Sequence, residues 1–560
     1  MFDSLTRWAA EQPDSIAVRL VDVDGKTPDQ TMSFAALHDR SSRVTQWLIE
    51  VGLQPAEGFA LLMENSLHQF EFGWGARRAG LYYTPISIHL KPAEVAYVLK
   101  DCGARLLVIT PGMAALAEQV KAILIDDGVK PPMCCVVGGV YKAFVQVDLA
   151  LQKFSSDTPL PERPVGRDFL YSSGTTGFPK GVKRPLQSFA DRFKETQEFK
   201  VWREFFHFSK DTRYLSPAPL YHAAPLRYSM RVLEVGGSCV VMNHFRAEPA
   251  LRLMAEYRIT HSQWVPTMLI RMLDLPADVK GRYDLSNTQV AIHAASPCPP
   301  EVKRAIINWW GPVLYEYYGG SEGVGLTALT AQEWLAHPGS VGKAVYGVAH
   351  IKDDDGNELQ AGEQGKVWFS GAPRFEYHND PVKTAQAYDA TGHGTYGDIG
   401  HLDGEGYLYL SGRRTDLILS GGVNIYPQEI ENLLSTFPGV GDVAVIGVPH
   451  PEFGEAVKAV IEPKNWADAN DAFAEKLMAY CREHLAHLKC PRSVDFRESL
   501  PRHANGKLYK RHLMNEYAAH TPTFATAPSS ARPEDASAAL PPEGAVPCLG
   551  RPGAAADSPN

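Results

Sequence analysis

The chain has 560 residues, 44% of them hydrophobic and 21% charged, which is typical of a globular protein and excludes a disordered or fibrous one. At about 100–200 residues per domain, this length predicts several packed units. Lys and Arg number 55 against 64 Asp and Glu, for a net charge of −9. No block of basic residues stands out, so we expect no nucleic-acid partner.

The sequence offers no membrane span and no export signal. No run of about 18 apolar residues occurs, and the start, MFDSLTRWAAEQPDS, lacks an apolar core. The eight cysteines are sparse and have no framework spacing, which favours reduced thiols in a cytoplasmic protein. Cys134 and Cys135 are adjacent rather than spaced as zinc ligands are, so we interpret them as strand residues. Weak contact between a surface patch and a membrane stays open, since an apolar substrate would favour it.

Helical and short strand patterns alternate along the first 160 residues. Residues 33–52 are typical of a helix that begins after Ser33 and ends at Gly52. This alternation continues to about residue 311 and favours parallel β-sheets covered by helices, an α/β fold. In chain order we further expect a strand at 58–65, helices at 68–80 and 93–103, strands at 104–110 and 235–242, and helices at 249–260 and 301–311.

After Gly371 the pattern changes to short strands with glycine turns, at 366–371, 406–412 and 415–421. A helix, two strands and a second helix then predict a compact α+β unit from Tyr426 onward. We place a domain boundary near 412–416, which gives an N-terminal domain at 1–412 and a C-terminal domain at 413–520. Residues 521–560 are rich in Ala, Pro, Ser and Gly, so we expect a disordered tail.

The segment from Tyr171 to Val182, YSSGTTGFPKGV, carries the strongest chemical signal. Its glycines and small residues let a backbone wrap around a polyanion with N–H groups pointing inward, and Lys180 adds a positive charge. It is not a Walker A loop, because no Gly-Lys-Ser/Thr ends it. We interpret it as a phosphate-binding loop with hydroxyl donors at Ser172, Ser173, Thr175 and Thr176.

A second segment, Tyr315 to Gly323, reads YEYYGGSEG. A strand that ends in glycines, a hydroxyl and a carboxylate suits a contact with phosphate and metal at the strand's carboxyl end. Glu322 is a candidate ligand for Mg²⁺, which prefers carboxylate oxygen. An overlapping G-x-G-x-x-A pattern at 323–328 has no acid about 20 residues later, so we discount a dinucleotide site there.

Two further segments each have an ordinary alternative when taken alone. Asp398 can accept hydrogen bonds from both hydroxyls of a ribose and Arg413 can add donors, but a turn aspartate and a surface arginine would look the same. Lys507 follows a glycine in a loop and can reach into a cleft, although a solvated surface lysine is the alternative.

In this order, the four segments resemble the adenylate-forming superfamily of acyl-CoA synthetases, luciferases and peptide-synthetase adenylation domains, over about residues 1–516. The resemblance implies a large N-terminal domain of β-sheets flanked by helices, with a small β-barrel-like subdomain, followed by a small mobile α+β domain. It implies an AMP-forming acid–thiol ligase that uses ATP, CoA and Mg²⁺: a carboxylic acid becomes acyl-AMP with release of pyrophosphate, and CoA then takes the acyl group.

The resemblance also implies roles for single residues. Glu322 and Ser321 contact Mg²⁺ and the α-phosphate, Tyr318 stacks on adenine, and Lys507 bridges the acid and the phosphate in the first step. Ser172 is a second candidate metal ligand, Thr415 the hinge, and Gly421 and Gly422 the lining of the CoA tunnel. The implied catalytic residues are Lys507, Glu322, Ser321 and His222. The implied nucleotide-binding residues are Ser172, Ser173, Gly174, Thr175, Thr176, Gly177, Lys180, Ser296, Glu316, Tyr317, Tyr318, Ser321, Asp398, Arg413, Asn424 and Lys507.

The segment around His222 indicates which class of carboxylic acid the protein would use as its substrate. Peptide synthetases carry there an Asp that pairs with an ammonium group, and an amino acid here would leave that charge buried and unpaired. We expect an acyl pocket lined by His222, Trp264, His293, Gly319 and Gly320. The paired glycines favour a wide channel and hence a fatty acid, a steroid side chain or an arylalkanoate, unless they serve only the turn. A luciferase-like oxygenase and a non-catalytic nucleotide-binding protein remain as alternatives, and a homodimer stays open.

Overall fold

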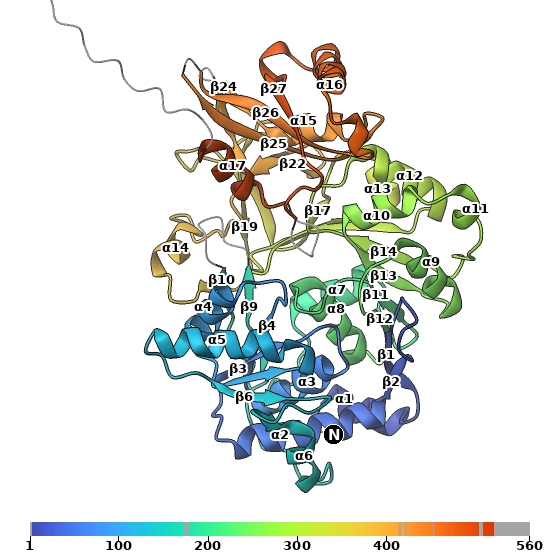
Figure 1. Cartoon of the computed structure of the whole chain (residues 1–560), viewed down its shortest axis with the longest axis vertical. Coiled ribbons are helices and arrows are strands. Elements are labelled where there is room, and N and C mark those ends of the chain that lie inside the picture. Colours follow the sequence, from blue (N-terminus) through green and yellow to red (C-terminus); the bar gives the residue numbers. More distant parts are fainter. Residues whose placement is uncertain are drawn as a thin grey trace, which may run out of the picture. The chain divides into compact units, whose positions relative to one another are not determined.

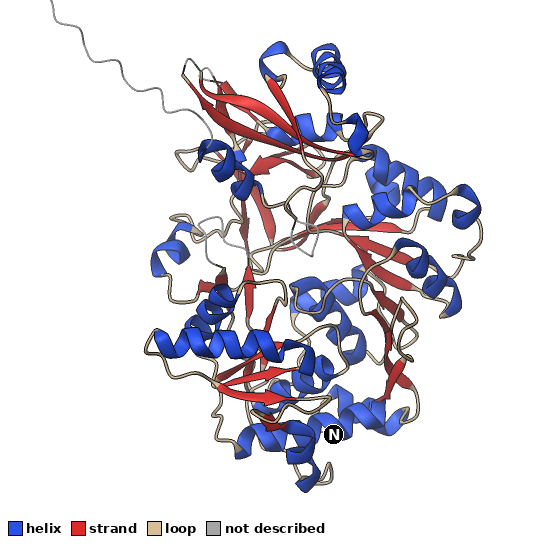
Figure 2. Ribbon diagram, viewed as in Figure 1, coloured by secondary structure: helices blue, strands red, loops and turns tan. Residues whose placement is uncertain are grey.

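The computed structural model describes residues 3–172, 179–413, 416–420, 423–451, 453–502 and 508–519, without the side chains of Ser172, Asn424, Ala518 and Ala519. It is a mixed α/β structure in which helices and strands alternate along residues 3–340 (Figures 1 and 2). The expected helix at 33–52 is α2 (Phe34–Glu50), and the side chain of Ser33 caps it by accepting a hydrogen bond from the N–H of Ala36.

The largest sheet has nine strands, with a parallel centre and antiparallel pairs at its edges. In spatial order the strands are β17 (Lys343–Tyr346), β16 (Leu326–Leu329), β15 (Leu314–Tyr318), β14 (Val290–His293), β13 (His261–Trp264), β11 (Arg213–Ser216), β12 (Ser238–Met242), β1 (Ile16–Val21) and β2 (Gln30–Ser33). Its central strands β11 to β14 are buried along almost their whole length, as expected for a parallel sheet covered on both faces.

A second sheet has six strands, all parallel to their neighbours. Cys134 and Cys135 lie on one of its strands, which confirms their interpretation as strand residues. The strands are β7 (Val145–Gln146), β6 (Met133–Val136), β5 (Leu106–Ile109), β3 (Gly58–Leu62), β4 (Tyr82–Ile86) and β8 (Arg167–Asp168).

One hydrophobic core is shared by the two sheets and by the helices between them. It contains Phe59 and Leu61 of β3, Val290 and Ile292 of β14, and buried side chains of α2, α3 and α8. The other face of the nine-stranded sheet packs on α9, α10, α12 and α13, and the other face of the six-stranded sheet on α4 and α5. The helix bounds are α1 (Ser4–Glu11), α3 (His68–Ala79), α4 (Pro92–Cys102), α5 (Ala114–Asp126), α6 (Val147–Ala150), α7 (Gln197–Phe205), α8 (Ala223–Glu234), α9 (Ala247–Glu256), α10 (Pro266–Leu273), α11 (Ala277–Lys280), α12 (Pro300–Trp310) and α13 (Ala331–Ala336).

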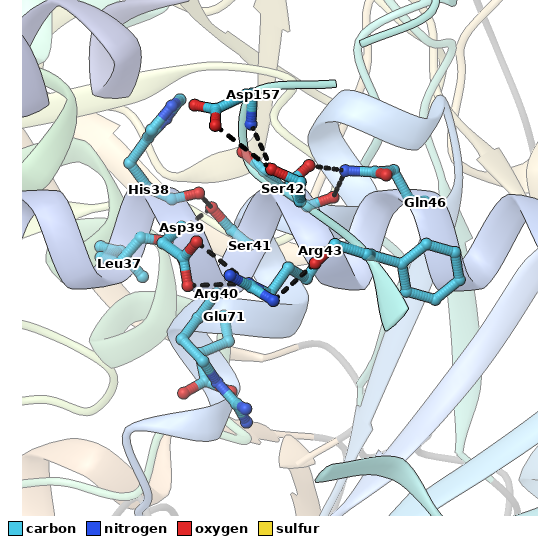
Figure 3. A network of polar contacts seen from close by, with 12 residues as sticks. Leu37, His38, Asp39, Arg40, Ser41, Ser42, Arg43, Gln46, Glu71 and Asp157 are labelled. Atoms are coloured by element: carbon cyan, nitrogen blue, oxygen red, sulfur yellow. Dashed lines mark hydrogen bonds and ion pairs between the residues drawn. The ribbon is translucent and has the colours of Figure 1, made fainter. Parts of the chain in front are cut away.

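Polar contacts hold α2 in place on this core (Figure 3). Arg43 donates to both carboxylate oxygens of Asp39 and to the carbonyl oxygen of Phe154, while Arg40 reaches the buried Glu71 of α3 at 3.1 Å. A glycine lets the two helices approach, since a Cβ on Gly75 would lie 2.5 Å from a methyl group of Val44. The packing of α2 on α3 is therefore fixed by both charge pairing and a small residue.

Two small antiparallel sheets follow, and they enclose a common core that includes Val182, Val324, Val367, Phe369 and Leu408. One consists of β20 (Glu376–Tyr377), β10 (Lys180–Lys183) and β9 (Leu170–Ser172), and the other of β18 (Val348–Lys352), β19 (Gly365–Ser370), β21 (Asp398–Leu402) and β22 (Leu408–Arg413). Helix α14 (Pro381–Gln386) follows β20.

The expected α+β unit is present within residues 416–519. Its five-stranded sheet packs on α15 and α16 on one face and on α17 on the other. The elements are β23 (Ile418–Ser420), β24 (Val423–Ile425), α15 (Pro427–Leu434), β25 (Val440–His450), β26 (Gly454–Pro463), α16 (Asp471–His484), β27 (Ser493–Phe496) and α17 (Lys510–Ala519).

Seven cysteines lie in the described part of the chain, and all seven are free thiols. None of the helices in the described ranges has both the length and the apolar character that a bilayer crossing requires.

Candidate functional site

Four of the predicted site residues, Ser296, Tyr318, Ser321 and Glu322, lie at or just after the carboxyl ends of β14 and β15, where α/β sheets bind ligands. Ser296 follows β14 in a turn whose preceding residue, Ala295, has a left-handed backbone with φ 78°. Tyr318 ends β15, and the glycine turn with Ser321 and Glu322 follows directly. A left-handed alanine is unfavourable on its own, so the surrounding structure holds this turn in place.

Tyr318 and Arg413 both bind the carboxylate of Asp398. The phenol of Tyr318 donates to Oδ2 at 2.5 Å, and Nε of Arg413 donates to Oδ1 at 3.1 Å. Burial and the neighbouring Asp398 carboxylate raise the pKa of Tyr318 well above its usual value, so the phenol keeps its proton and acts as the donor. Each carboxylate oxygen retains a further lone pair, and both can accept from a diol.

Glu322 is held by a residue that the sequence analysis missed. Tyr377 of β20 donates a hydrogen bond of 2.9 Å to Oε1 of Glu322, and Nζ of Lys180 lies 5.7 Å from the centre of the same ring. Burial and the Glu322 carboxylate raise the pKa of Tyr377. This tyrosine therefore links the carboxylate of one motif to the lysine of another. No motif marks it, because the link depends on the pairing of β10 with β20.

The two glycines of the turn are exposed on one side and closely packed on the other. A Cβ on Gly320 would lie 2.5 Å from the ring of Tyr396, and one on Gly319 would lie 2.9 Å from a methyl group of Leu326. Tyr396 is itself fixed, since its hydroxyl donates to the carbonyl oxygen of Gly325 at 2.8 Å. The packing of the turn already requires glycine, so the glycine pair gives no separate indication of a wide channel.

The pairing of Ser172 with Lys180 in β9 and β10 brackets the predicted phosphate loop. Residues 173–178 of this loop, the predicted catalytic lysine, and the predicted hinge and CoA-tunnel residues all lie outside the part of the chain that the structure describes. Outside the described residues lie Ser173, Gly174, Thr175, Thr176, Gly177, Thr415, Gly421, Gly422 and Lys507, together with the side chains of Ser172 and Asn424.

Two of the residues predicted to line the acyl pocket, Trp264 and His293, lie on the opposite face of the nine-stranded sheet from the third, His222. Trp264 packs on Trp310 and Phe245 beneath α9 and α12, and His293 is fully buried on the same face of the sheet. His222 occupies the N-cap position of α8, which covers the opposite face. Successive residues of a strand point to opposite faces, so Gln263 and Ile292, not their neighbours, face α8.

Glu316, like His293, points away from the α8 face. Its Oε2 accepts from Nζ of the buried Lys303 of α12 at 2.5 Å and lies 3.6 Å from Nε2 of His293. Burial raises the pKa of Glu316 although Lys303 lowers it, and burial together with Lys303 lowers the pKa of His293 well below its usual value. Any contact of Glu316 with the nucleotide must therefore come from its backbone.

The face below α8 is aromatic and polar. Tyr228 of α8 stacks on Tyr317 of β15 with ring centres 5.8 Å apart and an interplanar angle of 18°. The amide nitrogen of Gln263 donates to the Tyr317 hydroxyl at 3.4 Å, and its oxygen accepts from Tyr214 at 3.3 Å. The sequence signal that indicates this set is the alternation along β13 and β15.

Two family models match the chain. The model of the AMP-binding enzyme matches residues 5–375, and that of the AMP-binding enzyme C-terminal domain matches residues 429–507. The long-chain-fatty-acid–CoA ligase FadD13 of Mycobacterium tuberculosis (strain ATCC 25618 / H37Rv) is 30% identical over 92% of this chain and 99% of its own length. A feruloyl-CoA synthase of an Amycolatopsis species is 29% identical over 91% of this chain and 98% of its own.

Solved structures show the same architecture. The crystal structure of ATP-bound MatB from Rhodopseudomonas palustris superposes with a TM-score of 0.76 at 26% identity, covering 92% of this chain and 99% of that one. The likeness extends over both the large sheets and the C-terminal unit, because the coverage spans nearly the whole described chain.

Proposed function

Because this chain belongs to the family of AMP-binding enzymes and is an AMP-forming acid–CoA ligase, we propose that its substrate is a bulky or long apolar carboxylic acid. A fatty acid, a steroid side chain and an arylalkanoate are the candidates. FadD13 is named for long-chain fatty acids and the Amycolatopsis relative for feruloyl-CoA, two acids with large apolar parts. Tyr221 and His222 stand where an amino-acid substrate would need a carboxylate partner.

The single observation that carries the ligase chemistry is the convergence of Tyr318, Asp398 and Arg413 beside Glu322. A carboxylate is a poor electrophile, and its conversion to a mixed anhydride with AMP supplies a good leaving group. We assign adenine to the ring of Tyr318, the ribose diol to Asp398 and Arg413, and the phosphates to the 172–180 segment with Lys180. Positive groups and aligned N–H donors are what a phosphoryl-transfer transition state requires.

The donor set around Glu322 fits Mg²⁺. Tyr377 occupies one carboxylate oxygen, and the other can join phosphate oxygens and water around a hard cation that prefers oxygen ligands. Once bound, Mg²⁺ would neutralise charge on the phosphates, while Glu322 and Tyr377 hold its position. Lys507 is proposed to bridge the acid and the α-phosphate in the first half-reaction only, with Thr415 as the hinge that delivers it and Gly421 and Gly422 beside the CoA thiol in the second.

For the acyl site we keep His222 and replace Trp264 and His293 by residues of the α8 face, Gln263 and Tyr317. The carboxylate of the bound acid would lie at the reaction centre. The acyl chain would extend from there past His222 and along α8 towards the stacked pair of Tyr228 and Tyr317. The polar edge of this wall, formed by Gln263 and two phenols, suits an acid that also carries an oxygen substituent.

The test is an acid panel with the purified chain, ATP, Mg²⁺ and CoA, in which both AMP and acyl-CoA are measured. We expect equal amounts of AMP and acyl-CoA with at least one fatty, steroidal or aryl acid, and loss of both with Asp398→Asn. No AMP with any acid would favour a non-catalytic nucleotide-binding protein. AMP with oxygen uptake but without acyl-CoA would favour a luciferase-like oxygenase.

A further inference from the structure

A cavity rich in arginine shares none of its lining residues with those assigned to the nucleotide. It has a volume of about 1090 Å³ and is walled by parts of α1, α3, α7 and α8, by β8 and by the chain that follows β10. Thirteen Lys and Arg residues line it against five Asp and Glu residues, so the cavity carries a large excess of positive charge. We propose that this cavity binds a phosphate dianion, free or as the monoester of a larger molecule.

The innermost charges do not balance. Arg227 pairs with Asp168 at 2.7 Å. One carboxylate, that of Glu198, serves both Arg184 at 2.8 Å and Arg231 at 2.6 Å. Arg167 of β8 makes no ion pair with any carboxylate in the described part of the chain. Four guanidinium groups thus face two carboxylates, which leaves an excess of two positive charges.

Arg167 is the guanidinium group that lacks a carboxylate partner among the described residues. Nη1 donates to the carbonyl oxygen of Pro185 at 3.2 Å, whereas the buried Nε has no acceptor. Burial and the nearby charges of Arg184 and Arg227 lower the pKa of Arg167 to about 10. A half-buried cation among like charges is unfavourable without a counter-charge. An anion that accepts from Nε would supply both the missing hydrogen bond and the missing charge.

The excess of two charges matches a dianion better than a single carboxylate. Guanidinium groups bind phosphate with paired hydrogen bonds, and arginines from separate elements can approach its oxygens from different sides. The cavity also borders the proposed catalytic turn from behind: a Cβ on Gly323, the residue after Glu322, would lie 3.1 Å from Cζ of Arg184. An anion held by Arg184 and Arg167 would therefore fix the position of this turn without entering the nucleotide site.

The experiment measures the melting temperature Tm of the full chain with the nucleotide site saturated by the non-hydrolysable α,β-methylene-ATP. Inorganic phosphate is then titrated against chloride at matched ionic strength. We expect phosphate to raise Tm by about 2 °C or more beyond chloride. Arg167→Gln should abolish this rise without lowering Tm in chloride, because the variant removes a charge that has no ion-pair partner in the described part of the chain.

Arg40→Gln is the matched control, since Arg40 is ion-paired with Glu71 and Asp148 outside the cavity. It should lower Tm yet keep the phosphate response. Arg231→Gln gives a second variant if Arg167→Gln does not fold. Equal responses to phosphate and chloride, or an unchanged phosphate response in the folded cavity variant, would overturn the proposal. Sedimentation of the wild-type chain, but not of Arg167→Gln, with phosphatidic acid vesicles would identify a lipid headgroup as the source. A response to soluble phosphate without sedimentation would identify a free phosphate.

Discussion

Tyr318 and Asp398 lie on different sheets, 80 residues apart in the chain, and are joined by a hydrogen bond of 2.5 Å. The two residues belong to separate motifs, to which we assign adenine and ribose. Their contact means that the two halves of the proposed nucleoside site are already assembled. A site built in this way loses little conformational entropy when its ligand binds.

The first prediction concerns this contact. Asp398→Asn should lower kcat/KM for ATP about 100-fold, because a charged acceptor for the ribose hydroxyls is lost. Tyr318→Phe keeps the ring and should cost about tenfold or less. Steady-state release of pyrophosphate measures both values. A larger loss for Tyr318→Phe than for Asp398→Asn would contradict the assignment of the ribose to Asp398.

The second prediction separates the two half-reactions. Lys507→Ala should reduce acyl-AMP formation on the order of 10²–10³-fold, because one positive contact to the transferring phosphate is lost. Thioester formation from supplied acyl-AMP should stay close to wild type. Lys489→Ala, which removes a lysine paired with Glu429, serves as the control and should change neither step. Equal losses in both steps for Lys507→Ala would exclude the proposed role.

The third prediction follows from the packing of the glycine turn. Gly320→Leu should lower Tm and reduce activity with every acid alike, because its side chain would collide with Tyr396. The double variant with Tyr396→Ala should recover part of the loss. Acid-panel kinetics and thermal melts test this, and a selective shift towards small acids without loss of stability would revive the wide-channel interpretation.

The fourth prediction tests which face of the sheet meets the acid. Tyr317→Ala removes the ring that stacks on Tyr228 and should shift preference towards longer or bulkier acids, seen as a change of tenfold or more in relative kcat/KM. Trp264→Phe, a change of similar kind on the opposite face, should lower stability and leave the preference unchanged. The reverse pattern would return Trp264 to the acyl pocket.

The fifth prediction is a pH dependence. Burial alone would raise the pKa of Asp3, but Arg78 and hydrogen bonds from Thr6 lower it from 3.8 to about 2. A lowered carboxyl pKa contributes stability that is fully present above pH 3.8 and is lost as pH falls through about 2. Asp3→Asn should therefore reduce the free energy of unfolding by about 2 kcal/mol at neutral pH, and by progressively less below pH 4. Denaturant melts across this range measure the difference, and a constant difference would show that the charge of Asp3 is irrelevant.

Much of the fold could be predicted because the signals are local. The helix at 33–52, for example, was set by a serine cap, an apolar face and a terminal glycine, all within one short segment. The nucleotide-binding residues proposed at the end of β15 and the start of β21 could likewise be chosen from the sequence, because their motifs place glycine, hydroxyl and carboxylate groups in fixed order along the chain.

The residues of the acyl site are harder to predict from the sequence. Whether His293 or its neighbour Ile292 faces the acyl site depends on the direction in which each side chain leaves β14. The sequence does not distinguish the two directions, because apolar residues of helices cover both faces of the sheet. The partner of Glu322 escaped detection because Tyr377 lies 55 residues away and carries no motif. The pairing of β10 with β20 places Tyr377 beside Glu322, and the sequence around Tyr377 does not indicate that pairing.

The alternation along β15 has a consequence for engineering. Tyr315 and Tyr317 face one core, whereas Glu316 is tied to Lys303 on the other side. Saturation libraries at the two tyrosines could thus be screened for new acids without disturbing the charged pair. Side chains on one face of β15 can therefore be varied, while those on the other face keep the contacts that hold the fold together.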